Sequence, residues 1–179
     1  MKIIPLTQTD SSYKQELAKL LSVTWPDDYP TLASQEIEGL FAEERIALGA
    51  IEGQHLIGFV GAIPQYGKTG WELHPLVVDP VYQHRNVGTD LVQALENEVK
   101  KQGGITIYLG SDDETSATSL SDTDLYEETF KKISTIKNYK HHPYEFYQKL
   151  GYQIVGVFPD VNGLGKPDIW MAKRIVTDK

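Results

Sequence analysis

The period of the apolar positions changes several times along the chain, and each change predicts an element of secondary structure. Apolar residues recur at helical spacing from Leu17 to Leu21, which predicts a helix that ends before Pro26. We expect a short strand before this helix, at residues 2–7, and a second short helix after it, beginning at Ser34.

Strand patterns dominate the next part of the chain. Apolar runs predict strands at residues 45–51, 55–63 and 71–78, and the turn at 52–54 joins the first two as a hairpin. After a polar loop at 79–86 the spacing becomes helical. The apolar face of this helix is formed by Val87, Leu91, Val92, Leu95 and Val99.

A further strand pattern follows that helix. Gly103-Gly104 ends the helix, and the apolar run at 105–109 predicts a buried strand, an order that favours a parallel crossover. The rest of the pattern predicts a polar loop at 110–124 and helices at 125–136 and 142–150. It predicts two final strands at 152–158 and 168–175. We therefore expect one α/β (mixed α+β) domain over residues 1–179, in which helices flank a twisted mixed sheet of about seven strands.

Composition narrows the classes of partner. The chain has 17 Lys and Arg against 25 Asp and Glu, a net charge of −8, which argues against a nucleic-acid partner and suits a cationic one. It has no cysteine, which excludes disulfides, thiolate metal sites and a cysteine nucleophile and fits a cytoplasmic location. No apolar run approaches about 20 residues, so we expect neither a signal peptide nor a membrane span.

The strand at 71–78 carries an acid and a histidine that face the same way. Glu72 and His74 are two residues apart, so a strand places both on one face as candidates for a base. Alternatively, Glu72 is a solvated ion-pair partner, and His74 orients a substrate or is a satisfied core histidine. The residues expected to face the core are Trp71, Leu73, Pro75 and Val77.

Pro75 interrupts the hydrogen-bonding capacity of this strand. Because proline has no N–H, its position suggests a bulge or a splay of the sheet near Pro75-Leu76. A splay would leave the Leu76 N–H free to bind a carbonyl, and the backbone of Leu76, Val77 and Val78 free to pair with a ligand. The alternative is an edge strand with nothing bound.

The loop that follows has the order expected of an anion site. Free N–H groups at the start of a helix bind phosphates, helped by the helix dipole. The residues expected to form this cradle are Gln83, His84, Arg85, Asn86, Val87, Gly88 and Thr89. The alternative is an ordinary polar helix cap.

Two stretches give the chain its resemblance to the GNAT superfamily of acetyl-CoA-dependent N-acetyltransferases. QHRNVG (83–88) resembles the pyrophosphate loop Q/R-x-x-G-x-G/A, with Asn86 where the first glycine is usual, and FYQKLGY (146–152) resembles the Tyr-x-x-x-Gly-aromatic pattern. Asparagine tolerates the left-handed conformation, so we expect the loop to survive. Within the superfamily, TWPDDY, VGAIPQYG, GWELHPLVV and KPDIWMAK resemble the aminoglycoside 6′-N-acetyltransferases, especially the chromosomal enterococcal type.

The resemblance implies a reaction and roles for particular residues. An amine would attack acetyl-CoA directly in a ternary complex, with Glu72 as base, the Leu76 N–H as oxyanion donor and Tyr147 as acid for the thiolate. Tyr147 would also contact the cofactor, and His74 would assist at the substrate. The implied protein is a cytoplasmic homodimer that confers aminoglycoside resistance. The alternatives are acetylation of polyamines or peptide lysines, and a non-catalytic acyl-CoA binding module.

Acidic residues are the candidates for holding a polycationic substrate. Seven acids and no Lys or Arg lie between Asp112 and Glu128, which favours attraction of a cation, although such loops are usually just solvated. Asp112 is the first candidate because it follows a strand, and Trp25 and Tyr66 could wall a sugar ring. We expect no metal, because His141 and His142 would diverge on a helix and no partner has ligand spacing.

Overall fold

The computed structural model describes residues 1–26, 29 and 34–176. The chain divides into two compact units, residues 1–105 with Ile175 onward, and Thr106–Arg174. The fold class predicted from the sequence is confirmed: an α/β chain with a seven-stranded mixed sheet and flanking helices. Among the described residues, no helix has the length and apolarity needed to cross a bilayer.

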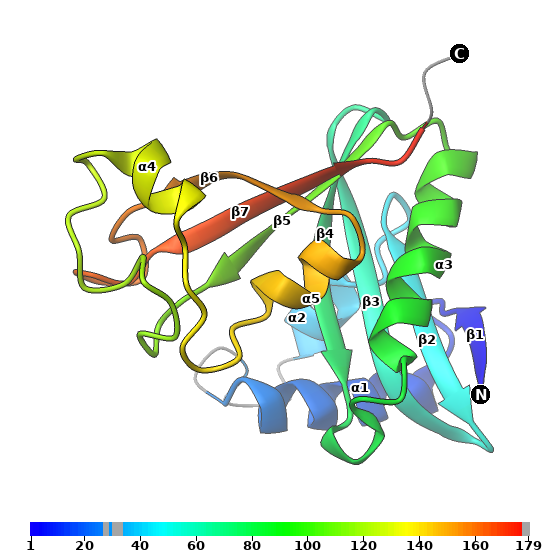
Figure 1. Ribbon diagram of the computed structural model, residues 1–179. Helices are drawn as coiled ribbons and strands as arrows, with labels where there is room; N and C mark the ends of the chain where they lie inside the picture. The colour runs from blue at the N-terminus through cyan, green and yellow to red at the C-terminus, as the bar shows by residue number, and fades with distance from the viewer. Residues whose placement is uncertain (27–28, 30–33, 177–179) are drawn as a thin grey trace. The chain divides into compact units, whose positions relative to one another are not determined.

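The first unit contains four antiparallel strands that follow one another in sequence order (Figure 1). They are β1 (Lys2–Pro5), β2 (Ile46–Glu52), β3 (His55–Tyr66) and β4 (Gly70–Val78). Its helices are α1 (Ser11–Thr24), α2 (Ser34–Gly39) and α3 (Val87–Lys101), and a short 3₁₀ turn, η1 (Pro80–Tyr82), precedes α3. Each of these strands and α-helices was predicted, to within a few residues at its ends.

Helices cover both sides of this four-stranded part. Leu17 and Leu21 of α1 form a core cluster with Phe59 of β3 and Val77 of β4, so α1 packs on the side to which these two point. On the other side, a Cβ at Gly58 would lie 3.1 Å from Leu91 Cδ1 of α3. Successive residues of a strand point to opposite sides, so α1 and α3 cover opposite sides.

A β-bulge at the predicted position of Pro75 changes which side the residues of β4 face. Val60 pairs with Leu76 and Ala62 with Leu73, so His74 and Pro75 lie opposite the single residue Gly61. The bulge predicted at Pro75 is therefore confirmed. It also corrects a prediction: Val77 does not share a side with Leu73, because the extra residue reverses the alternation, and Val77 packs under α1.

The second unit is a three-stranded antiparallel sheet with two short helices. Its strands, in the spatial order β5-β7-β6, are β5 (Thr106–Asp112), β7 (Asp168–Arg174) and β6 (Gln153–Phe158). Its helices are α4 (Thr129–Ser134) and α5 (Tyr144–Lys149).

Both helices begin later than predicted. The helix predicted from Leu125 starts at Thr129, because Glu128 has a left-handed backbone conformation, with φ of 50°. The helix predicted from His142 starts at Tyr144, because the Asn138 side chain bonds both the N–H and the carbonyl of His142. In addition, β5 extends to Asp112, so Asp112 is the last residue of the strand and does not follow it.

Candidate active site

The candidate base lies on β4 with one side-chain partner. Glu72 is half-buried, and its Oε2 accepts a hydrogen bond of 2.9 Å from Gln65 Nε2. Gln65 has no opposite residue in β4, because the register shifts between Pro64 and Tyr66. This second bulge gives Glu72 a neutral amide as its side-chain partner.

Glu72 and Tyr66, two candidate substrate residues of the first unit, share one side of the sheet. Glu72 pairs with Ile63, which lies four residues after Phe59 and so points to the side of α1. His74 is two residues from Glu72 and exposed, and Tyr66, which pairs with Gly70, follows the same alternation. His74 belongs to the bulge, where the alternation of sides is interrupted, so the shared direction of Glu72 and His74 stays a prediction.

Trp25 lies on the same side of the sheet, at the end of α1. Its N–H caps the helix by bonding Leu21 O at 2.8 Å, and its half-buried ring lies 6.3 Å from that of Tyr29. Trp25 packs against the core cluster of α1, so buried apolar side chains hold its ring in place.

The end of β4 presents backbone groups that β3 does not use. Asp79 N–H donates to Ile57 O at 3.0 Å, which shows that these two residues are a hydrogen-bonded pair of the antiparallel ladder. Hydrogen-bonded pairs alternate along such a ladder, so Val77 bonds Phe59 while the backbone groups of Leu76 and Val78 point away from β3. The Leu76 N–H thus points away from β3, whereas Val77 contributes core packing.

The loop before α3 has the conformation that an anion cradle needs. His84 and Asn86 both adopt left-handed backbone conformations, with φ of 59° and 64°, and α3 begins at Val87. The tolerance expected of asparagine at this position is confirmed. The first N–H groups of a helix have no partner within it, and here they belong to Val87, Gly88 and Thr89.

Three side chains fix this loop to the rest of the first unit. Val87 is buried, and Gln83 Nε2 donates to the Val78 carbonyl at 3.1 Å, which joins the loop to the end of β4. Arg85 lies over the Tyr82 ring, 5.4 Å from its centroid, with its charge exposed. The Tyr82 hydroxyl bonds the Glu52 carboxylate, which raises the pKa of that tyrosine.

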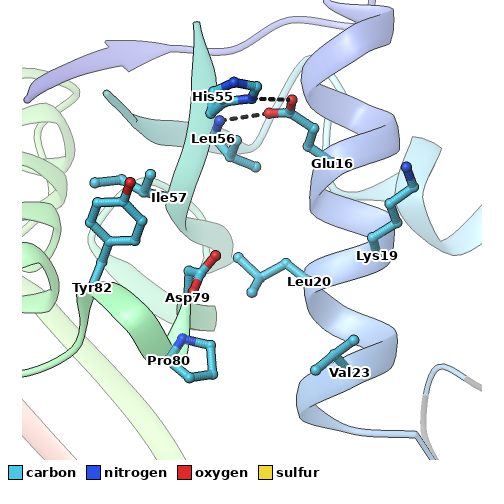
Figure 2. A pocket seen from close by; sticks show the side chains of 10 residues that line it. All are labelled: Glu16, Lys19, Leu20, Val23, His55, Leu56, Ile57, Asp79, Pro80 and Tyr82. Carbon is cyan, nitrogen blue, oxygen red and sulfur yellow. Dashed lines mark hydrogen bonds and ion pairs between the residues drawn. The ribbon is translucent and has the colours of Figure 1, made fainter. Parts of the chain in front are cut away.

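A cavity of about 450 Å³ lies elsewhere in the first unit (Figure 2). It is lined by α1, the start of β3 and the turn at η1 that follows β4. Glu16 closes one side by accepting from Leu56 N–H at 2.6 Å and pairing with His55 at 3.2 Å. None of the candidate residues lines it. This cavity therefore does not coincide with the candidate chemistry.

In the second unit, Asp112 is exposed at the end of β5. Its carboxylate accepts a hydrogen bond from Asn162 Nδ2, and it pairs across the ladder with Asp168, the first residue of β7. Asp168 accepts from Trp170 Nε1 at 2.6 Å. Sequence reasoning missed Asp168, because only the strand register shows that two acids lie opposite each other.

The seven acids from Asp112 to Glu128 do not form one cluster that faces solvent. Asp113 is only 1% exposed, and its carboxylate accepts from the N–H groups of Ala117 and Thr118 at 2.7 and 2.8 Å. Burial alone would raise the pKa of Asp113, but its hydrogen bonds from Ser121, Ala117 and Thr118 outweigh burial and lower it. Asp113 is thus a structural anion of the loop, which corrects its interpretation as a site for cations.

Tyr147 is buried on α5 among aromatic rings. Its ring meets those of Phe146 and Tyr152 edge-on, with centroids 5.1 and 5.8 Å apart. Burial raises the pKa of Tyr147, so its hydroxyl keeps its proton at neutral pH. A group that stays protonated can give a proton to a departing thiolate.

The two adjacent histidines differ from the prediction. Both precede α5, so their directions are set by the loop and not by helical geometry; His141 is exposed and His142 buried. Both ring nitrogens of His142 are engaged, Nε2 with the Asp112 carbonyl at 3.1 Å and Nδ1 with the Tyr144 N–H at 3.2 Å. Across the described part of the chain, no three His, Cys, Asp or Glu side chains lie close enough together to hold a metal ion.

The geometry can be set beside known proteins. Residues 14–131 match the profile of the acetyltransferase (GNAT) family. The structure superposes with a TM-score of 0.98 on an aminoglycoside 6′-N-acetyltransferase complexed with coenzyme A, which is 52% identical, with 100% of this chain and 99% of that one covered. No curated protein matches the chain.

Two further solved structures extend this likeness. The aminoglycoside 6′-N-acetyltransferase from Enterococcus faecium is 52% identical over 100% of this chain and 99% of its own, with a TM-score of 0.96. An aminoglycoside 6′-acetyltransferase type Ii is 45% identical, with both chains covered at 100% and a TM-score of 0.80. The likeness thus extends over the whole chain.

Proposed function

Because this chain belongs to the acetyltransferase (GNAT) family, we propose that it transfers the acetyl group of acetyl-CoA to the 6′-amino group of aminoglycoside antibiotics. The observation that carries the proposal is the identity of 52% over the whole chain to a 6′-N-acetyltransferase complexed with coenzyme A. Both units would serve one acetyltransferase domain, residues 1–179.

The amine is activated on β4. The Glu72 carboxylate takes a proton from the 6′-ammonium, directly or through a water, and the free amine attacks the thioester carbon. His74, predicted to face the same way, assists at the amine. No cysteine is present to carry an acetyl group, so the attack is direct and takes place in a ternary complex.

The charges that develop in the reaction have two partners. The Leu76 N–H donates to the oxygen of the tetrahedral intermediate, and its orientation away from β3 supports this role. As the carbon–sulfur bond breaks, Tyr147 gives its proton to the coenzyme A thiolate, and the proton that the attacking nitrogen loses returns Tyr147 to its neutral form. The place of Tyr147 in the stretch FYQKLGY (146–152), which resembles the family pattern, supports this role.

The two substrates contact different surfaces of the first unit. The backbone of Leu76, Val77 and Val78 follows the pantetheine arm, with Val77 acting mainly by holding the strand in the core. The loop of residues 83–89 holds the phosphates of coenzyme A through its N–H groups and Arg85. On the side of α1, Trp25 and Tyr66 contact the sugar rings, while Asp112 of the second unit binds an ammonium group.

The cellular setting completes the proposal. An enzyme that uses acetyl-CoA and lacks cysteine suits the cytoplasm, where it would act as a homodimer. Acetylation removes the positive charge of the amine, which weakens an aminoglycoside's attraction to anionic targets and would confer resistance.

The test compares two aminoglycosides that differ only at the 6′ position, one with an amine and one with a hydroxyl. Release of coenzyme A thiol with the amine alone, and an acetyl group located on that nitrogen by NMR, is the expected result. Spermidine and a basic peptide serve as further acceptors. If either of these were turned over in place of the aminoglycoside, the proposed substrate would be wrong.

A further inference from the structure

His142 connects the end of β5 and the start of α5, two parts of the second unit that carry residues with a role in the proposed function. We propose that His142 is a positioning residue, whose imidazole holds the end of β5 at Asp112 and the start of α5 at Tyr144 in a fixed relation. The inference rests on the proposed function, in which Asp112 binds an ammonium group of the substrate and Tyr147, one turn into α5, protonates the thiolate.

The two hydrogen bonds of the imidazole determine its protonation state. A carbonyl oxygen can only accept, so Nε2 donates to the Asp112 carbonyl at 3.1 Å. A backbone N–H can only donate, so Nδ1 accepts from Tyr144 at 3.2 Å. The ring must therefore be the neutral tautomer with hydrogen on Nε2. Burial lowers the pKa of His142 against the opposing pull of Asp112 and Asp113, which favours this neutral form.

The surroundings hold the ring rigidly in this place. His142 is only 5% exposed, and its ring lies 5.8 Å from that of Tyr144. Asn138 bonds its backbone twice, donating to the His142 carbonyl at 2.9 Å and accepting from its N–H at 2.7 Å. A ring clamped at its backbone and bonded at both nitrogens can transmit position from the strand to the helix.

Each bond leads to a different candidate group. The Asp112 carbonyl belongs to the residue whose side chain is proposed to meet the ammonium group, so loss of this bond should loosen substrate binding. The Tyr144 N–H lies at the first residue of α5, three residues before Tyr147, so loss of this bond should loosen the acid. The imidazole offers a donor and an acceptor at the two ends of one rigid ring, which an aliphatic or hydroxyl side chain cannot do.

Two substitutions separate these bonds. In His142→Asn the amide oxygen takes the position of Nδ1, so the bond to Tyr144 is kept and the bond to Asp112 is lost. In His142→Gln the longer amide reaches the position of Nε2, so the bond to Asp112 is kept and the bond to Tyr144 is lost. The matched control is His141→Asn, which changes the exposed neighbour at a left-handed position that asparagine tolerates.

The kinetic constants then give opposite patterns in the two variants. His142→Asn should raise the KM for the aminoglycoside about five- to tenfold, the effect of one hydrogen bond, with kcat little changed. His142→Gln should lower kcat by about the same factor with that KM little changed. Neither variant should move the KM for acetyl-CoA, and His141→Asn should resemble the wild type.

Two outcomes overturn the inference and remain distinct from failure of the proposed function. If both variants lose thermal stability yet keep wild-type KM and kcat, His142 is only structural. The same conclusion holds if, in both variants, the KM for the aminoglycoside rises and kcat falls by the same factor. If the wild type itself releases no thiol with a 6′-amine, the proposed function fails and the inference with it. Should the variants not fold, nitrogen-15 NMR of the wild-type ring decides, because any form other than the neutral Nε2–H tautomer contradicts the two bonds.

Discussion

The candidate groups on β4 of the first unit are positioned by apolar packing, whereas Asp112 of the second unit is positioned by buried polar residues. On β4, the groups stand on a strand whose two sides are covered by α1 and α3, with buried residues such as Phe59, Val77 and Leu91 beneath them. Around Asp112, the chain is irregular, and the buried side chains of Asp113 and His142 organise it through hydrogen bonds.

This difference separates the consequences of substitution. A side chain such as Glu72, which stands on an apolar framework with one polar partner, can be changed without disturbing the fold. A buried polar residue satisfies several backbone groups at once, so its removal leaves donors unpaired and costs stability as well as position. Function and stability should therefore respond separately in the first unit and together in the second.

The largest effect is expected on β4, from Glu72→Gln. Loss of the base should lower kcat about 10²- to 10⁴-fold, the usual contribution of a positioned general base, with the midpoint of urea unfolding unchanged. Steady-state thiol release and urea titration measure the two quantities. Glu44→Gln, at an exposed turn, is the control and should change neither. Unchanged turnover by Glu72→Gln across the pH range would remove this residue from its role as base.

Replacement of the buried acid Asp113 by alanine should have the next largest effect. Leaving the N–H groups of Ala117 and Thr118 unpaired should lower the free energy of unfolding by about 3 kcal/mol, measured by denaturant titration. Asp124→Ala is the comparison, because it removes an exposed carboxylate that bonds only one N–H, that of Tyr126. It should lower the free energy of unfolding by less than about 1 kcal/mol. Equal losses would contradict the contrast between buried and exposed acids.

Asp113 also predicts a dependence of stability on pH. Its pKa in the folded protein is below the ordinary value, so the unfolded chain binds the proton more readily. The stabilisation is complete above about pH 3.9, the ordinary pKa of aspartate, and is lost as the pH falls towards the lower folded value. Asp113→Asn, which carries no titrating proton, should flatten this acid limb of the stability curve. If the stability of Asp113→Asn fell as steeply at acid pH as that of the wild type, other carboxylates would be responsible for the acid limb of the curve.

The bulge in β4 provides an intermediate effect. A Cβ at Gly61 would lie 2.6 Å from the His74 carbonyl oxygen, so Gly61→Ala forces the backbone of the bulge to move. We expect a loss of about 1–3 kcal/mol in stability and a fall in kcat, because Glu72 and Leu76 flank the bulge. Gly39→Ala, whose new Cβ would meet no atom within 4 Å, is the control. Retention of full activity in Gly61→Ala would show that the position of the bulge does not matter for turnover.

The smallest effect is expected in the anion loop, from Arg85→Ala. Its exposed guanidinium should contribute about 1 kcal/mol, so the KM for acetyl-CoA should rise about fivefold while the KM for the aminoglycoside stays constant. Lys100→Ala, at the opposite end of α3, controls for loss of a positive charge. A rise in the aminoglycoside KM instead would place Arg85 on the other substrate.

The sequence predicts the framework well because the framework is apolar. Helical spacing identified α1 and α3, and the proline at position 75 identified the bulge, since a residue without an N–H cannot continue the ladder. The side that Val77 faces could not be read, because a bulge reverses the alternation and its length is not visible in the sequence.

The second unit shows what the pattern of residues does not contain. Its polar positions look alike in the sequence, yet Asp113 is buried while its neighbour Asp112 is exposed. The opposition of Asp112 and Asp168 depends on the register of β5 against β7, which connects residues far apart in the chain. Local propensity also misplaced the start of α5, because the side chain of Asn138, four residues earlier, bonds the backbone of His142 and competes with the helix there.

The left-handed residues before α3 have a consequence for the energetics of ligand capture. His84 and Asn86 hold conformations that disfavour most side chains, by roughly 1–2 kcal/mol for an ordinary L-residue. Asparagine tolerates this conformation better than most residues, so at position 86 less of that penalty has to be offset by the rest of the fold or by the affinity for a phosphate. A glycine at either position would relieve steric strain in the folded loop. It would also enlarge the unfolded ensemble, so the conformational entropy lost on folding would increase.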